Sequence, residues 1–330
     1  MAVSILAALL LLFVSVPYLI PLSEAGPVSV PYENSHILSV EGSSVHFRTW
    51  LPESGTMKGK LLFVHGLGGS TFSFEKNAPA LAEAGYAVLA ADLPGFGYSS
   101  RRTDENHAQA HRAALLWQVL DAADRMPGLQ AGEMQPWHLA GHSMGGGSVA
   151  AMALARPDRT ASLILIDGAL FDAGRRNRLL TLPVFSRWLQ VLLEHVLIQP
   201  RRIESFLTSA YGRPPEASDV TGYLTPLSLP GTARSALSML RTTQSLSEDE
   251  LAGITSPVLA LWGENDTWVP LAEADRIRRL LPQTALQVIP SAGHCPMETH
   301  ADAFNKQLLS WLGDPAKVGI QAQDAGKETQ

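Results

Sequence analysis

The chain has 330 residues, a net charge of −6 and a charged fraction of only 17%, and 46% of its residues are hydrophobic. A chain of this size can bury a large core, and we favour one large domain with an insertion over two smaller domains. It has no basic runs interleaved with aromatic residues, which argues against nucleic acid as a partner and favours a small ligand. Cys295 is the only cysteine, so a disulfide framework and a thiolate zinc cluster are excluded.

The N-terminal stretch is almost wholly apolar over residues 2–22, and its first charged side chain is Glu24. We therefore expect residues 1–25 to be a targeting or anchoring segment that is not part of the fold. Pro17 and the small-x-small sequence Ser23-Glu24-Ala25 favour a cleaved signal peptide. The missing basic side chain near the start argues against a signal peptide, and an uncleaved membrane anchor is an equal alternative. Both interpretations place the rest of the chain outside the cytoplasm, exported or anchored.

From residue 36 onward, short apolar segments alternate with amphipathic ones. Strands that are apolar throughout are typical of a parallel sheet covered on both faces, whereas the first two strands predict a hairpin. The first part of the chain, residues 26–168, is therefore expected to form most of an α/β domain. The expected strands are 36–40, 45–50, 60–64, 86–90, 137–140 and 161–166. The expected helices are 75–84, 108–125 and 144–155.

The alternation is interrupted over residues 169–247. This region has helical stretches such as 185–196 and several Pro-Gly loop signals, but no buried strand. It is predicted to be a helical cap inserted into the sheet domain. The domain resumes over 248–313, and a polar tail follows over 314–330. In the resumed part the expected strands are 257–262 and 285–289, and the expected helices are 271–281 and 301–312.

A strand-to-helix turn carries the candidate nucleophile, Ser143. Gly141 and Gly145 flank it in the pattern G-x-S-x-G, which allows a turn so sharp that the serine hydroxyl stands clear of the backbone. The helix after the serine directs free N–H groups and the positive end of its dipole toward developing negative charge. Because a strand precedes the turn and a helix follows it, we interpret Ser143 as the nucleophile of a nucleophile elbow.

A serine nucleophile needs a base, and the base needs an orienting acid. His294 follows the last predicted strand and Asp266 follows the strand before it, so both lie at the same sheet edge as the elbow. The chain order Ser, Asp, His is the one expected for such an elbow. Glu264 and Asp167 are rivals for the acid. Glu264 falls earlier in its loop, and Asp167 ends the strand before the cap, where a turn-capping role is the simpler interpretation.

Acyl transfer also needs N–H donors for the developing oxyanion. One is the backbone N–H of Met144, directly after the nucleophile. The second is expected from the loop after the strand 60–64, where Leu67 is our choice and Gly68 is its neighbour. His65 in the same loop is assigned a structural role, holding the backbone in shape.

The segment Asp92-Leu-Pro-Gly-Phe-Gly-Tyr-Ser99 is glycine-rich, but it lacks the spacing and the following helix of a phosphate-binding loop. It is interpreted as a tight turn held by Asp92. Phe96 and His142 are assigned to the substrate pocket. The basic cluster 175–178 in the cap is interpreted as a solvated face, with membrane contact as a minor alternative.

These motifs together resemble the α/β-hydrolase superfamily over about residues 36–313. The resemblance is to the branch with a helical cap that contains carboxylesterases, monoacylglycerol lipases, proline iminopeptidases and carbon–carbon bond hydrolases. It implies the α/β-hydrolase fold, a triad of Ser143, Asp266 and His294, and no metal or organic cofactor. A serine at the elbow speaks against haloalkane dehalogenases and epoxide hydrolases, which carry aspartate there. The matching motifs are His65-Gly66, Asp92 with Gly95, Gly97 and Ser99, Gly141 to Gly146, Gly263 with Asp266 and Val269-Pro270, and Gly293-His294.

The residue before the nucleophile favours one activity within this branch. Ring-cleavage carbon–carbon hydrolases usually carry asparagine there, and His142 departs from that pattern. We therefore expect a serine hydrolase that cleaves carboxylic esters, with a small-molecule ester or acylglycerol as substrate. A carbon–carbon hydrolase, an aminopeptidase and a non-catalytic small-molecule receptor stay open as alternatives. Membrane association through residues 2–22 also stays open.

Overall fold

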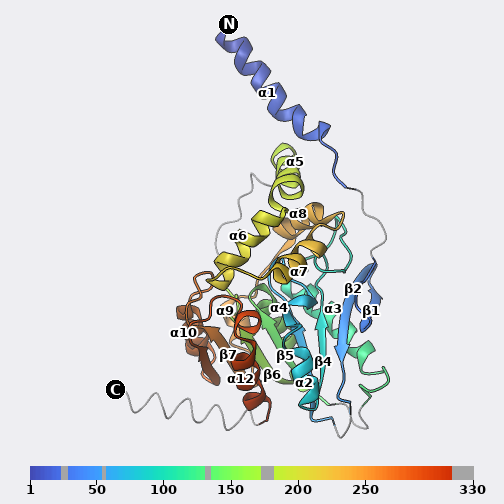
Figure 1. The fold of residues 1–330 in the computed structure, drawn as a ribbon, viewed down its shortest axis with the longest axis vertical. Coiled ribbons are helices and arrows are strands. Elements are labelled where there is room, and N and C mark those ends of the chain that lie inside the picture. The colour runs from blue at the N-terminus through green and yellow to red at the C-terminus, as the bar shows by residue number, and fades with distance from the viewer. Residues whose placement is uncertain (24–28, 54–56, 131–134, 172–181, 314–330) are drawn as a thin grey trace.

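The computed structural model describes residues 1–23, 29–53, 57–130, 135–171 and 182–313. Figure 1 shows one body built around a sheet, with a group of helices at one end of it and the N-terminal helix projecting beyond them. Two features discussed above, the basic cluster 175–178 and the tail 314–330, lie outside the described residues. Glu24 and Ala25 of the small-x-small sequence also lie outside the described residues.

An eight-stranded sheet forms the centre, in the order β1-β2-β4-β3-β5-β6-β7-β8. The predicted hairpin is confirmed, since β1 and β2 are antiparallel, and β2 also pairs antiparallel with β4. All other neighbours are parallel. Apolar strands such as β3 and β4 are buried on both faces, as their composition predicts. The strands are β1 (Ser35–Val40), β2 (Ser43–Trp50), β3 (Gly59–Val64), β4 (Tyr86–Ala91), β5 (Trp137–His142), β6 (Thr160–Ile166), β7 (Val258–Gly263) and β8 (Thr284–Ile289).

Helices cover both faces of the sheet and divide the core in two. Apolar residues of α3, α4 and α10 bury one face, whereas α2 and α12 bury the other. Removing this much apolar surface from water is the main stabilising term of such a fold. The helices are α2 (Ala78–Glu83), α3 (Gln109–Ala123), α4 (Met144–Ala155), α10 (Leu271–Leu280), α11 (Pro296–Thr299) and α12 (Ala301–Gly313).

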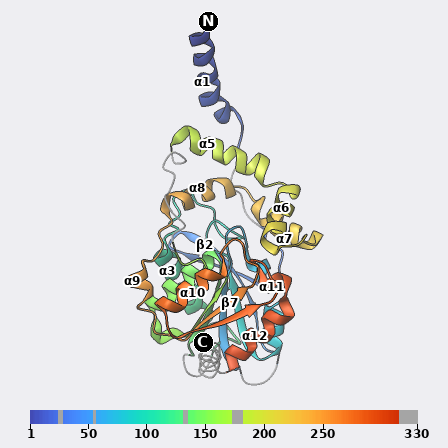
Figure 2. The same cartoon turned by 90° about the vertical axis from the view of Figure 1, so that its left-hand side faces the viewer.

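The described residues between β6 and β7 form helices joined by loops, and no strand lies among them. Figures 1 and 2 show its longer helices, α5 to α8, lying together over one end of the sheet. The predicted helix 185–196 is present as α5 followed by one turn of π-helix, Leu193–Leu197. The helices are α5 (Pro183–Leu192), α6 (Pro200–Tyr211), α7 (Ala217–Leu227), α8 (Thr232–Thr242) and the short α9 (Glu248–Leu251).

One predicted helix, 75–84, is wrong in extent. The chain forms a 3-10 turn at Thr71–Phe74 and only then the short helix α2. The Ser70 side chain accepts a hydrogen bond from the N–H of Phe72 and so starts the turn early. Pro79 occupies the first turn of α2, a position that proline tolerates because its missing N–H is not needed there.

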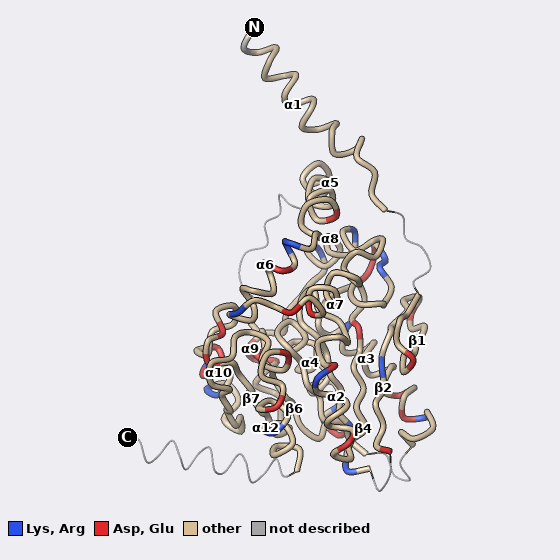
Figure 3. The backbone as a smooth tube through the Cα atoms, in the orientation of Figure 1, with Lys and Arg blue, Asp and Glu red and all other residues tan. Residues whose placement is uncertain are grey.

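The apolar N-terminal segment forms the helix α1 (Ala2–Leu19). Figure 3 shows no Lys, Arg, Asp or Glu along it. Within the described parts of the chain, no helix combines the length and the apolar character needed to cross a bilayer.

Candidate active site

Ser143 lies on the sharp turn between β5 and α4 with φ 49° and ψ −119°, a backbone conformation that L-residues rarely adopt. Glycines make the turn sterically feasible. A Cβ on Gly141 would lie 2.5 Å from the carbonyl oxygen of Gly145, and one on Gly145 would lie 2.4 Å from that of Val64. The local geometry is therefore that of a nucleophile elbow.

His294 and Asp266, from the loops after β8 and β7, are joined by a hydrogen bond of 2.7 Å from Nδ1 of the histidine to Oδ2 of the carboxylate. Both residues are buried. Oδ1 of Asp266 accepts bonds from the backbone N–H groups of Trp268 (2.7 Å) and Val269 (3.0 Å). Although burial opposes ionisation, the hydrogen bond and charge of His294 and the N–H of Val269 lower the pKa of Asp266. The carboxylate thus holds the proton of His294 on Nδ1 and leaves Nε2 free to accept one.

Ser143 and His294 line a cavity of about 340 Å³. Among the described residues, no hydrogen bond links the Ser143 hydroxyl to the His294 ring; such bonds commonly tighten only when substrate binds. The described residues of the lining are mainly apolar, and none of them is Lys, Arg, Asp or Glu. The lining residues are Gly66, Leu67, Gly69, His142, Ser143, Phe206, Leu207, Ala210, Tyr223, Trp268, Val269, His294 and Cys295.

One predicted oxyanion donor directly follows the nucleophile, and the other belongs to the loop after β3. Leu67 lines the cavity, and Met144 is the first residue of α4. Neither backbone N–H donates to another residue in the described structure, so both remain available to a ligand. Gly66 allows the close approach of the two loops, because a Cβ there would lie 3.0 Å from Cβ of Ser143.

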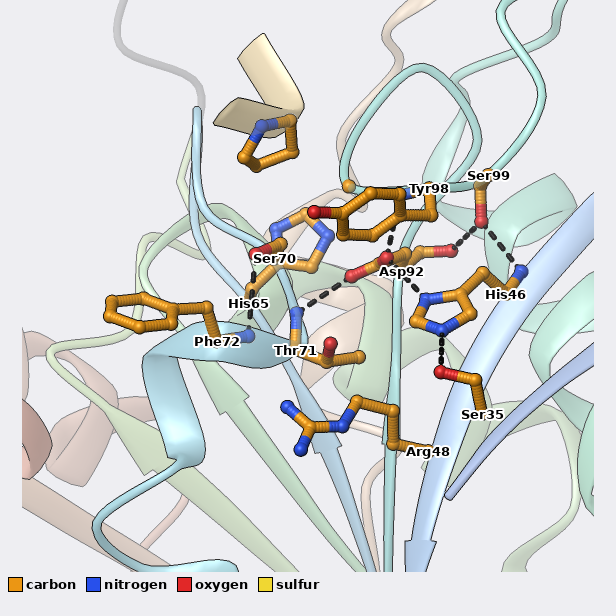
Figure 4. Close-up of polar contacts among 12 residues, drawn as sticks. Ser35, His46, Arg48, His65, Ser70, Thr71, Phe72, Asp92, Tyr98 and Ser99 are labelled. Atoms are coloured by element: carbon orange, nitrogen blue, oxygen red, sulfur yellow. Dashed lines mark hydrogen bonds and ion pairs between the residues drawn. The ribbon is translucent and has the colours of Figure 1, made fainter. Parts of the chain in front are cut away.

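A buried network around Asp92 holds the loop that carries Leu67 (Figure 4). The Asp92 carboxylate accepts bonds from the N–H groups of Thr71 and Tyr98, both at 2.7 Å, and from Nδ1 of His46 at 2.6 Å. A Cβ on Gly97 would overlap this carboxylate at 1.9 Å. The predicted tight turn held by Asp92 is confirmed.

His65 has the structural role expected from the sequence. Its Nδ1–H donates to the carbonyl oxygen of Gly66 (2.7 Å), and its Nε2 accepts from the N–H of Leu93 (3.0 Å). Burial lowers its pKa, which keeps the ring neutral and able to accept. Phe96 packs edge-on against this ring at 5.5 Å between centroids and is not among the residues that line the cavity. The expected place of Phe96 in the substrate pocket stays a prediction.

His142 lines the cavity but also braces the site. Its Nε2–H donates to the backbone carbonyl of His294 at 2.8 Å, and the two rings lie 4.8 Å apart. Burial, followed by the neighbouring His294, lowers the pKa of His142 to about 3, so the ring is neutral at physiological pH. This contact fixes the loop of His294 against the elbow.

Sequence reasoning missed the part played by α6. The N–H of His294 donates to the carbonyl oxygen of Ala210 at 2.7 Å. Trp268 stacks on the His294 ring at 5.2 Å and donates through its indole N–H to Ser209 at 3.0 Å. No sequence signal linked these distant residues, although Gly293 hinted at a close backbone approach.

A buried carboxyl group ties α6 and α7 to the same region. Glu298 on α11 accepts bonds from the hydroxyls of Tyr211 (2.5 Å) and Tyr223 (2.6 Å). Tyr223 also bonds with Ser73 at 3.0 Å. Burial raises the pKa of Glu298 to about 7, although the tyrosine donors oppose this. The carboxyl therefore changes its charge near neutral pH inside the interface between the cap helices and the core.

The rival acids occupy different positions. Glu264 accepts a bond from the N–H of Ser291 (2.8 Å) and stabilises its loop. Asp167 is fully buried beside Asp266. In the described residues, Asp167, Asp266 and His294 form a group whose potential ligand atoms lie within 4.8 Å of one another. Such a group could in principle hold a metal ion, but the atoms that His294 and Asp266 direct at each other are already used in their hydrogen bond.

Comparisons with known proteins agree with this fold. The family model described as alpha/beta hydrolase fold matches residues 60–301. A 2-hydroxy-6-oxononadienedioate/2-hydroxy-6-oxononatrienedioate hydrolase of Cupriavidus pinatubonensis is 27% identical over 292 residues, covering 85% of this chain and 96% of the relative. The crystal structure of a bacterial membrane phospholipase A superposes with a TM-score of 0.66 at 23% identity, covering 94% of this chain and 91% of the other. That of a putative aryl esterase from Burkholderia cenocepacia gives 0.65 at 18% identity, covering 87% and 99%.

Proposed function

The chain belongs to the α/β-hydrolase fold family, and from this premise we propose that it is a serine hydrolase that cleaves carboxylic esters. Ser143 is the nucleophile, His294 the general base and acid, and Asp266 the orienting acid. The observation that carries the proposal is the cavity of about 340 Å³ that both Ser143 and the Asp266-oriented His294 line. The described residues of its lining are mainly apolar and include no Lys, Arg, Asp or Glu.

Each step of ester hydrolysis can be assigned to a group of this site. His294 Nε2 accepts the proton of Ser143 as the hydroxyl oxygen attacks the ester carbonyl. The N–H groups of Leu67 and Met144 stabilise the oxyanion of the tetrahedral intermediate. His294 then gives its proton to the departing alcohol, and water, activated in the same way, hydrolyses the acyl-enzyme. Asp266 stabilises the imidazolium throughout and keeps its proton on Nδ1. The chain itself supplies every group used.

The cavity lining favours an apolar acyl group. Phe206, Leu207 and Val269 offer surface that gains about 0.8 kcal/mol for each buried CH₂. Short to medium acyl esters, including acylglycerols, fit a cavity of this size and lining.

Carbon–carbon bond hydrolysis is the second candidate, because relatives at 27–28% identity carry that activity in their names. The substrate in those names is a dicarboxylate. Recognition of two carboxylates normally uses arginine or lysine, and neither is found among the described residues that line this cavity. This difference supports ester substrates over dicarboxylates for this chain.

The test combines a nucleophile variant with a substrate panel. Ser143→Ala should lower kcat on p-nitrophenyl esters by roughly 10⁴- to 10⁶-fold and abolish labelling by a fluorophosphonate probe. Ser310→Ala, an exposed serine on α12, is the control and should keep both. Faster turnover of a vinylogous diketone or an aminoacyl substrate than of every ester would overturn the ester assignment. Tight ligand binding without labelling would indicate a receptor.

We also propose that α1 remains on the mature protein and contacts lipid, with the catalytic domain outside the cytoplasm. Its end is bound to the cap: Arg187 donates to the carbonyl oxygens of Pro17 (2.9 Å) and Ile20 (2.5 Å), and Trp188 donates to that of Phe13 (2.8 Å). Apolar side chains such as Leu6 stay exposed along α1, which favours a lipid surface as partner. Flotation of the full chain with lipid vesicles measures this contact.

A further inference from the structure

A second buried carboxyl group, that of Asp167, lies beside the Asp266–His294 pair. It follows β6, is completely inaccessible to solvent, and has a carboxylate oxygen within 4.8 Å of ligand atoms on both other residues. Its Oδ1 accepts a bond from the N–H of Gly263 at 2.9 Å. Its Oδ2 has no hydrogen-bond donor among the described residues.

The backbone holds Asp167 in this position at a cost. Its φ of 45° lies in the left-handed region, which is strained for a residue other than glycine. A carboxylate that capped the turn into the cap would accept from the N–H groups just after it. The side chain instead accepts from Gly263, at the end of the neighbouring strand β7. The strained turn thus directs the carboxyl toward the loop of Asp266 and does not serve the turn itself.

The surroundings of the two carboxyl groups stabilise a negative charge to different degrees. Asp266 receives three donors, the ring of His294 and the N–H groups of Trp268 and Val269. Asp167 receives one. Burial, then repulsion by Asp266, raises the pKa of Asp167 well above its ordinary range. Because two carboxylates this close cannot both ionise readily, the proton belongs on Asp167, whose Oδ2 is free to carry it.

We propose that Asp167 is a protonated positioning residue whose Oδ2–H donates to the Asp266 carboxylate, so that the two carboxyl groups share one negative charge beneath His294. No bond other than this hydrogen bond forms, and the proton stays on Asp167 while Asp266 serves His294. The fourth donor spreads the charge of Asp266 and fixes its plane relative to the imidazole. The role rests on the proposed function of Ser143, Asp266 and His294, whereas the site of the proton can be tested without it.

Asp167→Asn separates a protonated from an ionised side chain, because the amide is isosteric, neutral and still a donor. The acid limb of the pH profile of kcat/KM on a p-nitrophenyl ester reports the protonation of His294. If Asp167 is protonated, this limb should move by less than about 0.3 pH units and kcat should stay within about threefold of the unmodified enzyme. Asp167→Ala removes the donor and should move the limb upward by about 0.5 to 1 unit, since Asp266 becomes more basic.

Two results would overturn the proposal. A downward shift of the limb by about one unit or more in Asp167→Asn would mean that a negative charge had been removed next to His294. A loss of about 10³-fold or more in kcat would identify Asp167 as the orienting acid itself. Should Asp167→Ala fail to fold, the asparagine variant alone still distinguishes these cases.

Infrared spectroscopy at neutral pH locates the proton independently of activity. The difference spectrum between the unmodified chain and Asp167→Asn should contain the carbonyl band of a buried, protonated carboxylic acid. The control Asp158→Asn changes an exposed aspartate and should remove only a carboxylate band. A carboxylate band in the Asp167 difference would refute the protonated state even if Ser143→Ala behaved as expected. The protonated band would stand even if Ser143 proved not to be the nucleophile.

Discussion

Two successive helices of the cap, α5 and α6, meet the rest of the molecule in different ways. α6 buries Ile203, Leu207, Ala210 and Tyr211 and bonds to the loop of His294. α5 buries only Ser186 and Val191 among its ten residues. Its residue Phe185 is 40% exposed and packs against Phe13 of α1 at 5.8 Å.

This contrast separates two tasks within one insertion. α6 supplies a carbonyl oxygen, a cavity wall and a tyrosine that determine where His294 lies. α5 exposes apolar side chains such as Phe185, which contacts Phe13 of α1. These side chains are available to the lipid surface proposed above. Changes in α6 and its contacts should therefore act on catalysis and stability, whereas changes in α5 should act on location.

The largest expected effect concerns Glu298, which joins α6 and α7 to the core. Its pKa is about 7 in the folded protein against 4.5 for the free side chain, so the folded state holds a proton that the unfolded chain releases between these values. The free energy of unfolding should therefore fall as pH rises through this window, by roughly 3 kcal/mol. Glu298→Gln removes this contribution, because the amide does not ionise.

Urea unfolding at pH 5 and pH 8.5 measures the difference between Glu298→Gln and the unmodified chain. The variant should gain relative stability at the higher pH. Glu83→Gln, an exposed glutamate on α2, should follow the unmodified chain at both values. Equal differences at the two pH values would show that Glu298 does not hold a proton in the folded state.

An intermediate effect is expected where α6 touches the His294 loop. A Cβ on Gly293 would lie 2.6 Å from the carbonyl oxygen of Ala210 and 2.9 Å from the carbonyl carbon of Tyr211. Gly293→Ala must therefore displace the loop or the helix, and kcat on a p-nitrophenyl ester should fall by about 10²-fold. Gly313→Ala meets open space and should leave kcat unchanged. Unaltered turnover in Gly293→Ala would mean that α6 does not position the base.

The smallest effect on the enzyme itself is expected on α5. The double change Phe185→Ser and Leu192→Ser alters two exposed side chains, so stability should change by no more than about 0.5 kcal/mol per site and soluble-ester hydrolysis should persist. Vesicle binding should weaken by about tenfold, since apolar surface is lost. Ile37→Ser, at an exposed apolar residue on β1, should not change vesicle binding. Equal binding by both variants would disprove a lipid-facing α5.

The parts of the site that could be predicted are those governed by local rules. Ser143 is marked by the glycines that its turn requires, and Asp266 and His294 follow from their positions after the last two parallel strands. The start of α2 was misjudged because the cap at Ser70 favours a separate 3-10 turn.

The contacts of the cap could not be predicted because amphipathic helices bury a face without indicating which loop receives it. Nothing in the sequence pairs Ala210 with His294, or Tyr211 with Glu298. The position of the proton on Asp167 is a similar case. Sheet-edge logic places both aspartates at one edge, but only their burial and their unequal numbers of donors indicate which one keeps the proton.

The backbone hydrogen bonds of His294 limit how the insertion can change while the enzyme stays active. The N–H of His294 is bound by a helix of the insertion and its C=O by the elbow residue His142, so the insertion is not an interchangeable module. Exchanging the insertion between relatives would alter substrate preference and would also displace His294. This displacement would be avoided only if the α6 backbone at position 210 and the glycine at position 293 were transferred together. Recombination that respects this pair should yield active chimaeras, and new specificities should arise most readily on helices other than α6.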